Sequence, residues 1–284
     1  MDIIPLIRSA SIIMIPLLFA ATGGLFTSLC GKLNIALEGL LLAGAFFALT
    51  AFHYTGSIAA SLAAAVLSSV ILSALHVFAV FKLRANVFVS GLAINLLSSG
   101  LCVILQDRIF NSRGLVTIGN ISINHYGFII LILVLLVFCR IIIYKTPFGY
   151  YLRASTAETS NDKNSEALIS LGLKPQLYQI CAFFICAFFC GIGGAFLSLN
   201  LGAFIPGMSA GKGWIALVII FMGGKKPQGV LAAAFILSLI EAFSLRAQGF
   251  WKIPADFLLA FPYLCTLIAM IVASIFNRRL QKNR

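Results

Sequence analysis

The chain has 284 residues, of which 61% are apolar and only 10% are charged. A soluble domain carries about 25% charged residues, so this composition excludes a soluble enzyme, a disordered tail and a nucleic-acid-binding protein. The net charge of +12 would suggest a phosphate backbone as partner in a soluble protein, but here the basic residues stand between apolar runs. Since about 20 apolar residues cross a bilayer, the composition indicates a polytopic membrane protein.

The apolar runs predict an all-α membrane helical bundle of about nine transmembrane helices, within a range of 8–10. No stretch is left over for a separate soluble domain, so we expect residues 1–284 to form a single transmembrane domain. In chain order the expected spans are 5–29, 34–53, 57–80, 87–105, 126–144, 177–200, 209–224, 228–247 and 255–276.

The run 209–224 is short and is bracketed by glycines, at positions 207, 211, 213, 223 and 224. Transporters interrupt spans in this way beside a substrate path, and an ordinary short helix between glycine turns fits equally well. A second glycine-rich feature lies in the run 177–200, where Ala187, Gly191 and Ala195 form a row of small residues that permits close helix contact.

The basic residues indicate the orientation, because Lys and Arg are retained on the cytoplasmic side. With the C-terminus cytoplasmic, most of the 20 Lys and Arg residues fall inside. With nine spans the N-terminus is then outside. The basic residues expected on the outer side are Arg8, Arg108, Arg113, Lys212, Arg246 and Lys252.

One connection on the expected inner side is both long and polar, residues 145–176. Thr146 can cap a helix whose first position is Pro147. A second short helix is expected over 165–171, with Asn164 as its N-cap and Gly172 at the position that ends it. Such a short helix is marginal alone, so we expect it to pack against a partner.

Two polar residues inside apolar runs require an explanation, because polar groups in hydrocarbon are costly. Glu38 can line a polar translocation path, pair with a basic group to fix helix packing, or complement the dipole of its own helix N-terminus. Asn95 can face a polar path, although a hydrogen bond to a neighbouring helix is the favoured interpretation.

The sequence lacks common motifs for nucleotide binding, hydrolysis and metal binding. The sequence has no GxxxxGK[ST], HExxH, GxSxG or EF-hand loop, so it predicts no ATP site of its own, no catalytic residues and no metal site. The seven cysteines lie mostly in apolar runs and are interpreted as small hydrophobic residues. Transport or anchoring remains.

Several segments together resemble ABC importer inner-membrane permeases of the branched-chain amino acid and simple sugar superfamily, in particular the nucleoside-type branch that works with basic-membrane-protein lipoproteins. Each block alone is weak, but their order and spacing are specific, and the resemblance covers about residues 16–270. The matching blocks are 31–39 (GKLNIALEG), 89–97 (VSGLAINLL), 146–149 (TPFG), 153–154 (RA), 164–167 (NSEA), 171–173 (LGL), 211–217 (GKGWIAL) and 261–264 (FPYL).

The resemblance implies two sets of site residues. A cytoplasmic coupling loop over 145–176 would engage the ATPase, although Ser165 and Leu168 depart from the usual Pro and Ala. Its residues would be Arg153, Asn164, Glu166, Ala167, Leu168, Leu171 and Gly172. The candidates for the translocation path or for helix packing are Asn34, Glu38, Asn95 and Trp214.

The resemblance also implies partners: a second permease subunit, in a heterodimer, paired ATPase subunits that bind the ATP, and an external substrate-binding lipoprotein. The chain would be a multi-pass protein of the bacterial inner membrane that imports nucleosides. Riboflavin and simple sugars are the alternative substrates. An ion-coupled secondary transporter is an alternative class, but it needs intramembrane carboxylates, and Glu38, Glu241 and Asp256 are the few candidates.

Overall fold

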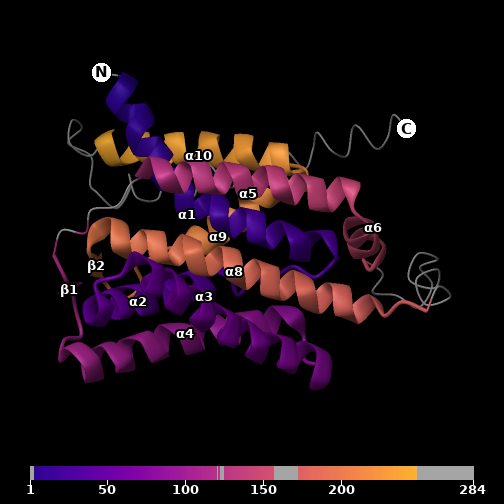
Figure 1. Ribbon diagram of the computed structural model, residues 1–284, viewed down its shortest axis with the longest axis horizontal. Helices are drawn as coiled ribbons and strands as arrows, with labels where there is room; N and C mark the ends of the chain where they lie inside the picture. Colours follow the sequence, from indigo (N-terminus) through magenta and orange to yellow (C-terminus); the bar gives the residue numbers. More distant parts are fainter. Residues whose placement is uncertain (1–2, 120, 122–124, 157–171, 248–284) are drawn as a thin grey trace.

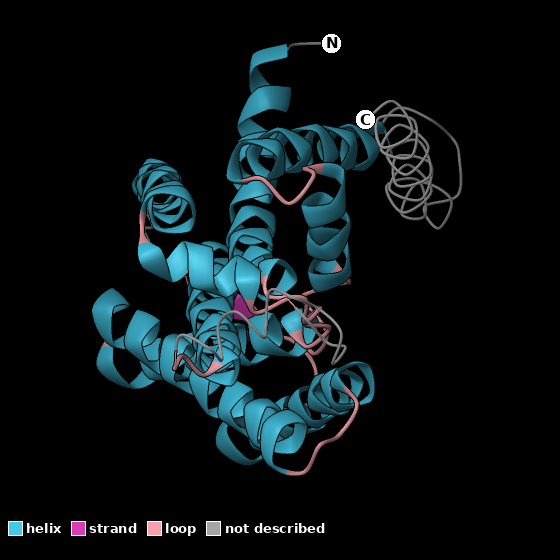
Figure 2. Ribbon diagram, turned by 90° about the vertical axis from the view of Figure 1, so that its right-hand side faces the viewer, coloured by secondary structure: helices cyan, strands magenta, loops and turns pink. Residues whose placement is uncertain are grey.

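The computed structural model describes residues 3–119, 121, 125–156 and 172–247. Within these ranges seven helices are long and apolar enough to cross a membrane. They are α1 (Ile3–Leu29), α2 (Leu37–Thr55), α3 (Ile58–Val77), α4 (Val87–Phe110), α5 (His125–Lys145), α8 (Pro175–Leu201) and α10 (Pro227–Ala247). Figure 2 shows how completely helices make up the described chain.

Four shorter elements and one π-helical turn complete the described fold. The π-helical turn Phe78–Lys82 extends α3, and the short helix α6 (Pro147–Ala154) follows α5. The strands β1 (Val116–Thr117) and β2 (Ala203–Phe204) pair antiparallel. The last short element is α9 (Lys212–Met222), an 11-residue helix.

The sequence predicted about nine full spans, and one of them takes a different form. The run 209–224 contains α9, whose 11 residues span about 16 Å at 1.5 Å per residue, about half of a 30 Å hydrocarbon core. The residues before it, from Ile205 to Gly211, are turns, and Gly207 and Gly211 have positive φ angles of 75° and 77°. The predicted span 255–276 lies outside the described residues.

The helices α1, α2, α3 and α8 meet through glycines, which lets their backbones approach closely. A Cβ at Gly191 of α8 would lie 2.8 Å from the carbonyl oxygen of Ala65 in α3, and a Cβ at Gly44 of α2 would lie 2.9 Å from the carbonyl oxygen of Gly191. The row of small residues predicted on α8 (Ala187, Gly191 and Ala195) therefore makes contacts within the chain. Figure 1 shows α1, α8 and α9 between a layer of α5 and α10 and a layer of α2, α3 and α4.

The bundle has two distinct ends (Figure 1). The α6 end carries α6, the end of α5 and the start of α8, and the strand end carries β1 and β2. Since α8 ends at Leu201 at the strand end and α10 begins at Pro227 at the α6 end, residues 203–222 take the chain from one end to the other. We call this segment the β2–α9 crossing. It consists of one short strand, a run of turns and the half-length helix α9.

Candidate functional site

Glu38, in the first turn of α2, is bonded to the N-terminus of α9. Its Oε1 accepts a hydrogen bond from the Gly211 N–H at 2.8 Å, and its Oε2 accepts one from the Gly213 N–H at 2.7 Å. The first N–H groups of a helix have no partner inside that helix, and a carboxylate there also complements the helix dipole. Glu38 therefore satisfies two backbone donors at the point where the β2–α9 crossing becomes helical.

Gly213 has no room for a side chain because of this contact. A Cβ on Gly213 would lie 2.6 Å from the Cα atom of Glu38, a separation that real Cβ atoms do not show. Gly211, at the N-cap of α9, has a φ of 77°, a conformation that favours glycine. Both glycines are thus required by the approach of α9 to α2.

Two asparagines hold the start of α2. Asn34 accepts a hydrogen bond from the Ala36 N–H at 3.0 Å and donates one to the Cys186 thiol of α8 at 3.4 Å. Asn95 of α4 donates to the Ile35 carbonyl at 3.0 Å and accepts from the Gly39 N–H at 2.8 Å. The start of α2 thereby lies against the middle of both α4 and α8.

Asn34, Glu38, Asn95, Gly211 and Gly213 together form what we call the α2–α9 junction. Two helix N-termini meet there, inside the bundle and away from both of its ends. Asn34 is fully buried. Both oxygens of the Glu38 carboxylate accept hydrogen bonds from backbone N–H groups of the α9 N-terminus. Trp214 lies in the first turn of α9 but on its exposed side, with 43% of its surface accessible.

Lys212 and Glu241 form an ion pair beside the junction. The Nζ of Lys212, the first residue of α9, lies 3.3 Å from Oε1 of Glu241 in α10, and their side chains are only 16% and 18% exposed. The sequence placed Lys212 within the expected span 209–224, toward the outer side; in the structure the turns before α9 carry the chain into the bundle, so Lys212 lies beside the junction. A buried charge of this kind requires a partner, which Glu241 supplies.

The α6 end contains the predicted cap and part of the predicted coupling loop. Thr146 is the N-cap of α6, accepting a hydrogen bond from the Gly149 N–H at 3.4 Å, and Pro147 is the first helical residue, as predicted. A Cβ on Gly149 would collide with the carbonyl oxygens of Ile142 and Ile143. The chain can therefore turn sharply from α5 into α6 only with glycine at this position.

Arg153 packs on the protein surface at this end. Its guanidinium lies 5.2 Å from the ring centre of Tyr144 and 5.0 Å from that of Tyr150, and its Nε donates to the Gly149 carbonyl at 3.2 Å. Gln179 of α8 donates to the Ser155 carbonyl at 2.7 Å. We call this group, Tyr144, Gly149, Tyr150, Arg153, Ser155 and Gln179, the α6 corner.

A further contact joins the residues beyond the α6 corner to α1. The Thr156 hydroxyl oxygen lies 3.1 Å from the carbonyl oxygen of Leu29, the last residue of α1, and also contacts the carbonyl oxygen of Arg153. Gly172 has a φ of 74°, which is the conformation expected of a residue that ends a helix. The remaining predicted coupling residues, Asn164, Glu166, Ala167, Leu168 and Leu171, lie outside the described residues.

The structure thus brings three of the four predicted path or packing residues, Asn34, Glu38 and Asn95, to one place. Sequence reasoning missed their partners, Cys186, Gly211 and Gly213. The glycine pair on either side of a lysine in the block 211–217 was the available signal, since closely spaced glycines favour close backbone approach. Within the described part of the chain, no group of three or more His, Cys, Asp and Glu residues could hold a metal ion.

Comparison with known proteins identifies the class. The family of branched-chain amino acid transport system permease components matches residues 6–273, and the chain belongs to this family. It is therefore a transport subunit and a multi-pass protein of the inner membrane, as the sequence predicted.

Individual relatives cover nearly the whole chain. A nucleoside ABC transporter permease protein, NupC of Lactococcus lactis, is 28% identical over 287 residues, spanning 90% of this chain and 87% of the relative. A guanosine ABC transporter permease protein, NupQ of Bacillus subtilis, is 28% identical over 284 residues with the same coverage. A putative glucose ABC transporter permease protein, TsgC13 of Haloferax volcanii, is 26% identical over 251 residues, spanning 82% and 74%. No solved structure matches the chain.

Proposed function

We propose that this chain is the membrane permease subunit of an ATP-driven importer of nucleosides. The observation that carries the proposal is its similarity over 90% of its length to two permeases named for nucleosides and for guanosine. A simple sugar is the second candidate substrate, because a relative named as a putative glucose permease also matches. Riboflavin remains the third alternative from the sequence.

The orientation we propose follows from the charges at the two ends of the bundle. The α6 end faces the cytoplasm and the strand end faces outwards, in agreement with the retention of basic residues inside. The described basic residues at the α6 end include Lys82, Arg84, Arg140, Lys145, Arg153, Lys174, Lys225 and Lys226, against Arg8, Arg108, Arg113 and Arg246 at the strand end. The N-terminus is then outside and the C-terminus cytoplasmic.

In this arrangement the partners divide the work. An external lipoprotein delivers the substrate at the strand end, and ATPase subunits dock on the coupling loop 145–176 and bind the ATP. A second, different permease completes the membrane part. The contact between Thr156 and Leu29 gives the coupling loop a direct link to α1, whose end leads within a few residues to Asn34 and Glu38.

The translocation path follows the β2–α9 crossing. Irregular backbone at membrane depth is tolerated only where it is buried in protein or lines a water-filled cavity, and half-length helices in transporters border substrate sites. Glu38 acts as a latch that fixes the N-terminus of α9, and Trp214, on the exposed side of the same turn, offers an aromatic ring for a nucleobase to stack on. Movement of α9 relative to Glu38 opens and closes the path.

Uptake by the complete complex tests this function. Cells expressing the permease with its partner subunits and binding protein are compared for uptake of labelled guanosine, uridine, glucose and riboflavin. We expect saturable, ATP-dependent uptake of the two nucleosides, and Trp214→Ala should lower it while Trp214→Phe retains most of it. Uptake of glucose or riboflavin without nucleosides would assign the other substrate.

Labelling of single cysteines tests the orientation separately. In a cysteine-free variant, Leu115→Cys is placed beside β1 at the strand end, and Tyr150→Cys lies in α6; both native side chains are exposed. An impermeant thiol reagent should label Leu115→Cys in intact cells and Tyr150→Cys only after the membrane is permeabilised. The reverse pattern would invert the permease in the membrane.

A further inference from the structure

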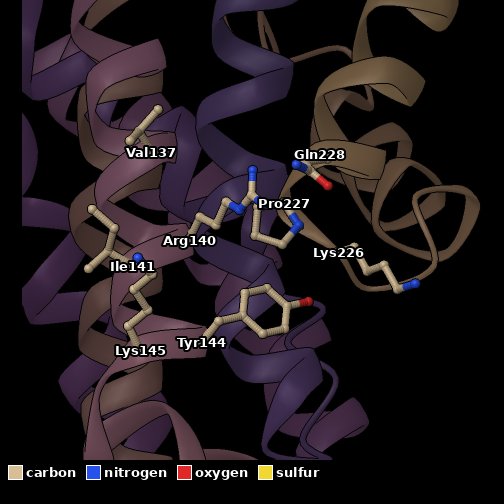
Figure 3. Close-up of a pocket in the computed structure, with 8 residues that line it drawn as sticks. All are labelled: Val137, Arg140, Ile141, Tyr144, Lys145, Lys226, Pro227 and Gln228. Carbon is tan, nitrogen blue, oxygen red and sulfur yellow. The ribbon is translucent and has the colours of Figure 1, made fainter.

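A pocket of about 550 Å³ lies between the last turns of α5 and the first turn of α10, at the α6 end of the bundle. Figure 3 shows its lining residues: the Arg140 and Tyr144 side chains extend from α5 toward Pro227 and Gln228, and the Lys226 ammonium points away from them. The pocket is remote from the α2–α9 junction, since none of the junction residues lines it. It therefore has a role that the translocation path does not explain.

Three cationic side chains line this pocket, Arg140 and Lys145 from α5 and Lys226 from the turn before α10. The ion pairs among described residues are those of Arg113 with Asp107 and of Lys212 with Glu241, so no described carboxylate neutralises these three cations. Turning the Gln228 amide over, so that its oxygen rather than its nitrogen faces the guanidinium, lets it accept hydrogen bonds from both Nη1 and Nη2 of Arg140, the latter at 3.3 Å. That neutral contact orients the guanidinium, and its charge has no carboxylate partner among the described residues.

Part of the pocket wall, on the same helix as Arg140 and Lys145, is apolar. Val137 and Ile141 of α5 line it and are 56% and 44% exposed. They continue the outward apolar face of α5, on which Ile130 and Val134 are also exposed, so this wall lies at hydrocarbon depth. From Val137 to Lys145 the helix rises about 12 Å, at 1.5 Å per residue. The pocket thus grades from an apolar surface to a cluster of cations.

We propose that this pocket binds an anionic phospholipid through its phosphate headgroup. Basic pockets between transmembrane helices at the cytoplasmic side suit such headgroups. The phosphate binds to the Arg140 guanidinium, and Lys145 and Lys226, which line the same pocket, add positive charge around it. The phenol of Tyr144 lies at the level of the headgroup as interfacial aromatics do, and the acyl chains run along Val137 and Ile141. A free phosphate or an acidic protein surface would use the cations and leave the apolar wall uncovered.

The bound lipid would hold α5 and α10 together. α10 carries Glu241, the partner of the first residue of α9, whereas α5 leads directly into α6 through Thr146. The pocket therefore connects the helix that supports the α2–α9 junction with the helix that supports the α6 corner. The assignment to the cytoplasmic leaflet rests on the orientation proposed above, but the binding itself does not, because it can be measured in detergent.

Lipid titration of the purified permease tests the proposal. Binding of phosphatidylglycerol and of phosphatidylcholine is measured by native mass spectrometry for the wild type, Arg140→Gln, Lys226→Gln and the control Lys225→Gln. Lys225 is adjacent in sequence but lies outside the pocket lining, with its ammonium 5.8 Å from the Phe221 ring centre. Since one interfacial cation is worth about 1 kcal/mol, each pocket variant should bind phosphatidylglycerol about fivefold more weakly, and the control should match the wild type.

Two further arms separate the possible occupants. Ile141→Ser should weaken phosphatidylglycerol binding while sparing any binding of inorganic phosphate, because it alters only the apolar wall. Displacement of phosphatidylglycerol by millimolar inorganic phosphate would make this a soluble-anion site and overturn the proposal. Equal binding of phosphatidylglycerol by all variants would also overturn the proposal. So would a Lys226→Gln variant that binds lipid normally but no longer co-purifies with the ATPase, because the cations would then contact the ATPase. If Arg140→Gln does not fold, Lys226→Gln carries the comparison with the control Lys225→Gln.

Discussion

The α2–α9 junction and the α6 corner both fix the start of a short helix, but with different interactions. At the junction a carboxylate and two amides bond to backbone groups inside the bundle. At the corner, tyrosine rings, a guanidinium and one close-packed glycine hold α6 at the surface. Inside a membrane no water replaces a lost backbone partner, whereas at the surface it does. Equivalent substitutions should therefore lower the free energy of unfolding more at the α2–α9 junction than at the α6 corner.

The largest effect is expected at the ion pair beside the junction. Lys212→Met or Glu241→Met leaves one buried charge without its partner, and should lower the free energy of unfolding by about 3–5 kcal/mol. The double variant, Lys212→Met with Glu241→Met, should recover most of that loss, because neither charge remains. Unfolding in mixed detergent micelles measures all three. Additive losses in the double variant would show that the two side chains do not interact.

Glu38→Gln tests the two hydrogen bonds between the Glu38 carboxylate and the N-terminus of α9. Glutamine keeps one oxygen acceptor but loses the charge and one of the two bonds to α9, and a hydrogen bond to a charged group is worth about 1.5–3 kcal/mol. We expect a loss of unfolding free energy in this range, accompanied by lower uptake by the assembled importer. Unchanged stability together with lost uptake would instead assign Glu38 to contact with the substrate.

Gly213→Ala tests how closely α9 approaches α2. The added Cβ would force α9 away from Glu38, and overpacking of this kind costs about 1–3 kcal/mol. The matched control is Gly100→Ala, because nothing lies within 4 Å of a Cβ at Gly100 in α4. The control should be neutral or stabilised by about 0.5–1 kcal/mol, since alanine favours helix over glycine. Melting temperatures that fall equally in both variants would contradict the close approach.

The smallest effect is expected at the α6 corner. Arg153→Ala removes contacts with two exposed tyrosine rings, which are worth about 0.5–1 kcal/mol each at exposed sites. Lys174→Ala is the control, because the Lys174 side chain makes no capping hydrogen bond at the start of α8. If Arg153→Ala lowered the free energy of unfolding as much as Glu38→Gln, the expected difference between the α6 corner and the α2–α9 junction would be contradicted.

The sequence predicted the helices well and their partners poorly. Runs of apolar residues located the seven long helices, because length and composition are local properties, and Thr146 with Pro147 located the start of α6 for the same reason. Glu38 and Gly211 are 173 residues apart, so no local pattern could join them. The ion pair of Lys212 with Glu241 was not predicted either, because Glu241 stands on another helix.

The separation of Glu38 from Gly211 also has a consequence for the synthesis of the permease. At 5–20 residues per second, the ribosome needs roughly 9–35 s to add the 173 residues between them. Throughout this interval Glu38 has no α9 to bond to, and a charged side chain inside a transmembrane segment opposes its insertion. The first half of the chain therefore enters the bilayer before α2 can take up its final position. We expect α2 to reach its final depth only when α9 has left the ribosome.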